Sequence, residues 1–151
     1  MSACLKFSEK AHDLRPQPVD RATLSLIRFA ARACRASARL DLERACAIID
    51  ATPDTALHAL ISALPDALRQ PFRVYGLHEV DLTFDERWLL SVIDAMRRND
   101  MDSVWFLVTR RVPLHSRRWL IVLLRRVTDA IDQTTPSPHP KEEARYGTTR
   151  N

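Results

Sequence analysis

Five arginines near the start of the chain have a spacing suited to anion binding. At 100° per residue they fall within an arc of roughly 60° on one helix. They are Arg21, Arg28, Arg32, Arg35 and Arg39. No acidic residue lies between Asp20 and Asp41 to neutralise this arginine row, and like charges one turn apart repel by a few tenths of a kcal/mol per pair. The row is therefore predicted to bind an acidic protein surface or nucleic-acid phosphates, or to pair with acids of the later helices. Those acids are Asp81, Asp85, Glu86, Asp94, Asp100 and Asp102.

A second basic corner is predicted where two helices meet. Arg110 and Arg111 end one predicted helix, and Arg117 and Arg118 fall in the first turn of the next. Positive charge is unfavourable at a helix start, so this corner is a second candidate for anion contact, with a helix–turn–helix outline. The apolar stretch directly after it, at 119–122, argues against a helix that reads base edges.

The last predicted helix carries more apolar residues than one core-facing side needs. Ile121 and Val122 fall on the face opposite the expected core. A helix that is apolar nearly all round lies centrally in its domain or forms half of an interface. The pattern therefore predicts either a central helix or a homo-oligomer that forms through it.

Residues suited to acid–base catalysis are few. His78, Glu79 and Asp81 share an irregular connector, where sites often occur, and this makes an acid–base site the third functional hypothesis. An ordinary surface role explains these residues more simply. The five histidines lack a metal-ligand spacing such as HExxH, and the three cysteines form no CxxC pair. No metal and no cofactor is predicted.

Composition limits the class of protein. The 151 residues are 46% hydrophobic and 28% charged, with a formal net charge of +4, as expected for one soluble globular domain. Only two glycines occur, which disfavours glycine-rich phosphate loops. The scattered cysteines, and the lack of a signal-peptide or membrane-spanning apolar run, predict a soluble protein of the reducing cytoplasm.

The hydrophobic period predicts an all-α fold, a single compact bundle of about six helices. A strand at 104–108 is the alternative to the fifth helix, and Pro65 is expected to end or kink the third. Between the third and fourth helices, Phe72, Val74 and Tyr75 before Gly76 predict either a short extended piece or a connector held by its aromatic side chains. Thr83 and Glu86 predict a capping box for the fourth. The expected helices cover 20–39, 42–50, 54–64, 83–98, 101–111 and 115–131.

The helical domain is expected to span 19–133, between a flexible arm at 1–18 and a disordered Pro- and Thr-rich tail at 134–151. The first helix should bury the side opposite its arginines, because charge favours water. Its expected inner face consists of Leu26, Phe29, Ala30, Ala33, Ser37 and Leu40.

These patterns favour a small cytoplasmic, non-enzymatic regulatory or adaptor protein that acts through helix-surface contacts. The arginine row would contact an acidic protein partner. DNA binding through the same row is the alternative, with binding that weakens steeply as salt rises. An enzyme with an acid–base site near His78 is the second alternative.

Overall fold

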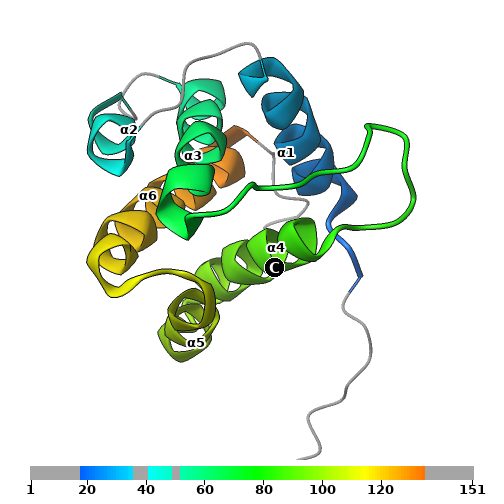
Figure 1. Cartoon of the computed structure of the whole chain (residues 1–151). Coiled ribbons are helices and arrows are strands. Elements are labelled where there is room, and N and C mark those ends of the chain that lie inside the picture. Colours follow the sequence, from blue (N-terminus) through cyan, green and yellow to red (C-terminus); the bar gives the residue numbers. More distant parts are fainter. Residues whose placement is uncertain (1–17, 36–40, 49–51, 135–151) are drawn as a thin grey trace, which may run out of the picture.

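The computed structural model describes residues 18–35, 41–48 and 52–134. Within these ranges the chain forms helices and no strand, which confirms the all-α prediction (Figure 1). The helices are α1 (Arg21–Cys34), α2 (Leu42–Ile48), α3 (Pro53–Leu68), α4 (Phe84–Arg97), α5 (Met101–Arg111) and α6 (Leu114–Thr134). Of the predicted arm at 1–18 and the predicted tail at 134–151, residues 1–17 and 135–151 lie outside the described residues.

Helix α3 lies at the centre of the bundle. It contacts α1 and α2 on its sides and α6 along its length, while α4 packs against α5, α6 and α1 (Figure 1). The core between these helices is formed by large, fully buried side chains, including Leu60, Leu64, Leu89, Leu120 and Leu124. No helix of the described chain combines the length and apolar character that crossing a bilayer requires.

Local signals in the sequence set most helix boundaries. The predicted capping box of α4 is present: the Thr83 hydroxyl accepts a hydrogen bond from the Glu86 N–H, and the Glu86 carboxylate accepts one from the Thr83 N–H. The side chains of Asp20 and Asp100 cap α1 and α5 in the same manner. These caps satisfy backbone N–H groups that a helix start leaves without partners.

Two expectations about the helices are not met. Pro65 does not end the third helix, because α3 continues through it to Leu68, and the C-cap residue Arg69 has a left-handed φ of 54°. Proline removes one backbone hydrogen bond, but Leu64 and Ala67 on either side are fully buried, and this packing keeps the segment helical. The strand alternative at 104–108 is also wrong, because Val104 and Val108 bury the same side of α5 at helical spacing.

The buried face of α1 differs from the predicted one. Of the expected inner residues, Ala30 is buried and Leu26 packs partly against the core, whereas Phe29 is 68% exposed and Ala33 is exposed; Ser37 and Leu40 lie outside the described residues. The buried side chains of α1 are instead Thr23, Leu24, Ile27, Arg28, Ala30 and Ala31. The helix is rotated toward its arginine side because Arg28 is held inside the fold.

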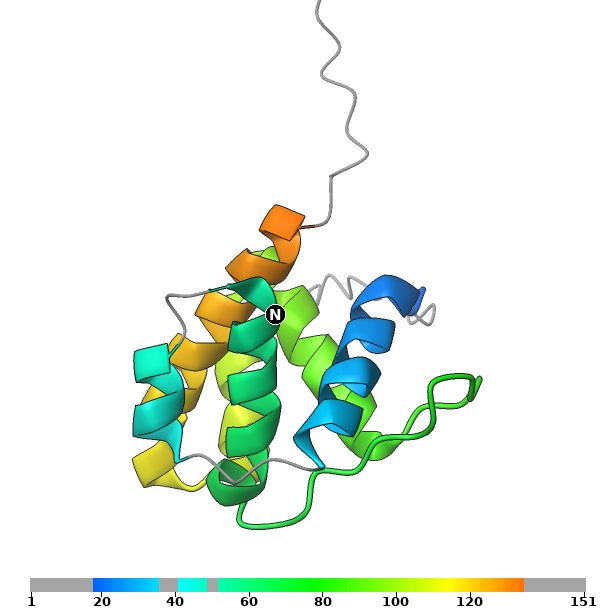
Figure 2. The same cartoon turned by 90° about the horizontal axis from the view of Figure 1, so that it is seen from above.

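A long connector joins α3 to α4 and forms one wall of the candidate site. It leaves the end of α3, crosses beside α1, swings outward and returns to the start of α4 (Figures 1 and 2). Phe72 and Val74 pack against the core from this connector. The connector thus brings irregular backbone next to the arginine side of α1.

Candidate functional site

Arg28 and Glu86 form a buried ion pair that holds the connector in place. Their side chains are 2% and 0% exposed, and the Arg28 Nε lies 2.7 Å from the Glu86 Oε1. Arg28 also donates to the backbone carbonyls of Glu79 (2.6 Å) and Asp81 (2.7 Å). One guanidinium therefore joins α1, α4 and the outer part of the connector. It can do so because an arginine presents several N–H donors in a fixed planar arrangement.

The Glu86 carboxylate accepts hydrogen bonds from three parts of the chain. Besides Arg28, it accepts from the backbone N–H groups of Tyr75 (3.1 Å) and Thr83 (2.8 Å). Burial alone would raise the pKa of Glu86, but these hydrogen bonds and the charge of Arg28 outweigh it and lower that pKa. In turn, the hydrogen bond to Glu86 raises the pKa of Arg28. Both groups are therefore charged in the folded protein.

The arginine row is divided by these contacts. Arg21 donates to the carbonyl of Val80 (3.1 Å), and Arg28 has the internal ion-pair role that was one of the predicted outcomes. Arg32 and Arg35 are exposed, and neither forms an ion pair or side-chain hydrogen bond with the described residues. Arg39 lies outside the described residues. Two arginines of the described row are thus available to an anionic partner.

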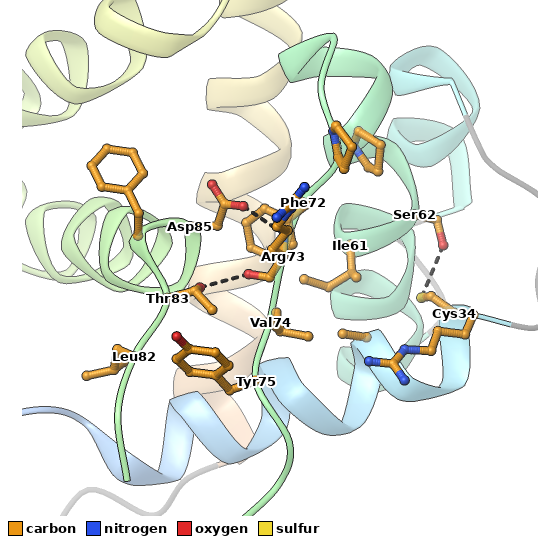
Figure 3. Close-up of a pocket in the computed structure, with 15 residues that line it drawn as sticks. Cys34, Ile61, Ser62, Phe72, Arg73, Val74, Tyr75, Leu82, Thr83 and Asp85 are labelled. Carbon is orange, nitrogen blue, oxygen red and sulfur yellow. Dashed lines mark hydrogen bonds between the residues drawn. The ribbon is translucent and has the colours of Figure 1, made fainter. Parts of the chain in front are cut away.

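A groove of about 820 Å³ lies between α1, α3 and the connector (Figure 3). Its volume falls within the range of ligand-binding clefts, roughly 300–1,000 Å³. The charged residues that line it are Arg35, Arg73 and Asp85. The other lining residues, mainly apolar, are Ala31, Cys34, Ile61, Ser62, Pro65, Pro71, Phe72, Val74, Tyr75, Leu82, Thr83 and Phe84.

The free charge of the groove is positive. Asp85 is neutralised by Arg111, whose Nη2 lies 2.6 Å from the Asp85 Oδ1. Asp85 also accepts from the backbone N–H of Arg73 (2.7 Å). The Arg73 side chain itself is exposed and has no partner among the residues described. Arg35 and Arg73 therefore give the groove two unpaired positive charges beside an apolar surface.

The second basic corner is largely engaged within the fold. Arg111 lies 4.9 Å from the ring centroids of both Phe84 and Trp88, in addition to its pair with Asp85. Contacts with these two aromatic rings explain why its buried Nη1 has no hydrogen-bond acceptor.

The other arginines of this corner have three different environments. Arg117 donates to the carbonyls of Val112 (2.8 Å) and Thr109 (3.2 Å), at the end of α5. Arg110 lies over the ring of Phe106. Arg118 is exposed and has no such partner within the described ranges. The corner offers one unengaged guanidinium where the sequence suggested four.

The last helix is central and also has an apolar exposed side. Leu120, Leu123 and Leu124 are fully buried, as expected, while Trp119 and Val122 are 48% and 41% exposed. Ile121 packs partly against the core. Self-association through this helix stays a prediction.

The structure does not bring an acid to His78. The side chains of His78, Glu79 and Asp81 are exposed, and that of His78 forms no hydrogen bond with the described residues. Glu79 and Asp81 contribute their backbone carbonyls to Arg28, and the Glu79 N–H donates to the carbonyl of Gly76 (3.2 Å). No group of three or more His, Cys, Asp or Glu side chains with metal-binding geometry occurs in 18–35, 41–48 and 52–134.

Cys34 is the one thiol that lines the groove among the described residues. Its sulfur accepts from the Ser62 hydroxyl (3.2 Å) and donates to the carbonyl of His58 (3.5 Å). Burial raises the pKa of the Cys34 thiol, which disfavours the thiolate form that acts as a nucleophile.

Sequence reasoning did not identify Arg73 or the groove. Glu86 was expected in a local capping box and was one of six acids that could pair with the arginine row; the structure pairs it with Arg28, 58 positions away. The sequence could not single out that pair, because it depends on how α1 packs beside the connector. The pattern of Phe72, Val74 and Tyr75 did suggest a short extended segment, but not that it borders a groove.

Comparison of the chain with protein-family models, curated proteins and solved structures finds no match. The function is therefore argued from the contacts of the chain itself.

Proposed function

We propose that this protein is a non-enzymatic adaptor that binds an acidic segment of a partner protein in the groove. The observation that carries the proposal is the group of unpaired arginines at its edge. Arg35 and Arg73 line the groove, and Arg32 lies about one turn before Arg35 on α1. We call these three residues the free arginines.

The mixture of charge and apolar surface favours a peptide over a nucleic acid. Steep, salt-dependent binding of nucleic acid draws on about 6–10 phosphate contacts, whereas Arg21, Arg28, Arg111 and Arg117 are all engaged within the fold. The groove instead supplies apolar contact area from the exposed rings of Tyr75 and Phe84. An acidic peptide with apolar side chains would satisfy both features of the site.

The test is binding of a fluorescein-labelled octapeptide made of four Glu-Val repeats, measured by fluorescence anisotropy. We expect the parent protein to bind it and to bind a Lys-Val octapeptide far more weakly. Exchanging Arg32, Arg35 and Arg73 together for Gln should weaken binding about tenfold, because each exposed pair contributes up to about 1 kcal/mol.

A matched control removes three charges elsewhere. Arg44, Arg98 and Arg118 are exposed, and their joint exchange for Gln lowers the net charge by the same amount. This control should bind the Glu-Val peptide as the parent does. Equal loss in both triple variants, or no loss in the first, would overturn the proposal. Tighter binding of a single-stranded oligonucleotide, lost with the free arginines, would assign the site to nucleic acid instead.

A further inference from the structure

The segment 71–75 of the connector has the alternation of an extended strand. Its side chains alternate between half-buried, at Phe72 and Val74, and exposed, at Arg73 and Tyr75. The hydrogen bonds of its backbone groups alternate in the same way. The N–H groups of Arg73 and Tyr75 donate to Asp85 and Glu86, and the Arg73 carbonyl accepts from the Thr83 hydroxyl (2.8 Å). A period of two residues, in both side-chain burial and backbone hydrogen bonding, indicates extended backbone.

One edge of this segment is therefore occupied, and the other, here called the free edge, has no backbone partner in 18–35, 41–48 and 52–134. The backbone groups of Arg73 and Tyr75 face Thr83 and α4. Those of Phe72 and Val74 point the opposite way, and they form no hydrogen bond with any residue that the structure describes. Figure 3 shows Ile61, Ser62 and Cys34, from α3 and α1, on that opposite side. The free edge thus opens on the groove.

We propose that the acidic partner segment binds in extended form and adds as a strand along the free edge at 72–74. This inference rests on the proposed function and specifies how the segment is held. The N–H and carbonyl groups of Phe72 and Val74 would bond to the partner's main chain. Strand addition to an unpaired edge is an established mode of peptide recognition, in which main-chain bonds give affinity.

The charge of the groove also fits this geometry. In an added strand, alternate side chains face the molecule and the solvent. Those facing inward lie beside the half-buried Phe72 and Val74, and those facing outward lie on the same side as Arg73. Opposite charges on neighbouring strands attract. The site therefore selects a segment in which acidic residues alternate with apolar ones.

Val74→Pro tests the strand mode. Proline removes the Val74 N–H, which has no partner in the described chain, and leaves the bonds of Arg73 and Tyr75 to α4 intact. We expect this variant to fold and to bind the Glu-Val octapeptide about tenfold more weakly than the parent. Val74→Ala, which keeps the N–H, should bind within about threefold of the parent.

A second measurement does not depend on that variant. Amide hydrogen exchange of the parent, with and without the Glu-Val octapeptide, should show the Phe72 and Val74 amides slowed on binding. If the peptide binds through the free arginines while these amides exchange at unchanged rates, strand addition is wrong and the proposed function stands. If the peptide does not bind at all, the proposed function itself fails.

Discussion

At the scale of single residues, burial decides which arginines can act on a partner. Arg28 and Arg32 stand one turn apart in the same row. Arg28 is 3% exposed and gives its hydrogen bonds to Glu86 and two carbonyls, whereas Arg32 is exposed and unpaired within the described ranges. Chemical type alone makes these residues equivalent. Their different neighbours make one structural and the other available.

Removing Glu86 should destabilise the fold severely. Glu86→Ala would leave the buried Arg28 without its counter-charge, and breaking a buried pair from one side costs about 3–5 kcal/mol. The free energy of unfolding in urea is the measurement. In the double variant Arg28→Ala/Glu86→Ala the loss should be smaller than the sum of the two single losses, because no lone charge remains buried. Additive losses would show that the pair is not energetically coupled.

At the scale of elements, the start of α4 combines two tasks. Thr83 caps the helix and also donates to the carbonyl of Arg73, so one hydroxyl fixes both the helix start and the extended segment of the connector. The capping box was readable from the sequence because its residues are three positions apart. The bond to Arg73 was not, since it spans ten positions.

Replacing Thr83 by a residue without a hydroxyl should therefore destabilise the fold, because both of these hydrogen bonds are lost. Thr83→Ala is expected to lower the free energy of unfolding by about 1 kcal/mol, the usual value of an N-cap. Thr83→Ser keeps the hydroxyl and should lose far less. Urea denaturation of both variants checks this, and equal losses would attribute the effect to the methyl group instead.

At the scale of the whole molecule, one arginine ties together the ends of three helices. Arg97 of α4 pairs with Asp20, the cap of α1 (2.6 Å), and with Asp132 of α6 (2.8 Å). Burial alone would raise the pKa of Asp20, but hydrogen bonds from Thr23 and Arg97 outweigh it and lower that pKa to about 2. The folded state thus favours the ionised carboxylate.

This pairing predicts a pH dependence of stability. Because the pKa of folded Asp20 lies below its ordinary value of 3.8, its contribution is complete above about pH 5 and is lost as pH falls toward 2. Asp20→Asn keeps a helix cap but not the charge. Between pH 4 and pH 2 the parent should lose more unfolding free energy than this variant. Urea titrations at each pH give the unfolding free energies. If those of the parent and of Asp20→Asn fall by the same amount between pH 4 and pH 2, the effect does not come from Asp20.

The sequence by itself determined the helical class and most helix starts. The signals that predicted them act within one or two helical turns, so the sequence shows them directly. They are the scarcity of glycine, the Thr83–Glu86 spacing and the helical period of residues such as Leu120, Leu123 and Leu124. They did not determine which side of α1 faces the core. From the sequence alone, the arginine row was expected to face outward, and Phe29 was therefore expected on the inner face.

Only the tertiary structure decided the fate of that row and the shape of the site. Arg28 is buried because Glu86, 58 positions away, offers it a carboxylate and the connector adds two carbonyls. The extended segment at 72–74 lies on the groove because α1, α3 and α4 surround it. Contacts between distant parts of a chain form only when the helices pack, so the local spacing of residues does not predict them.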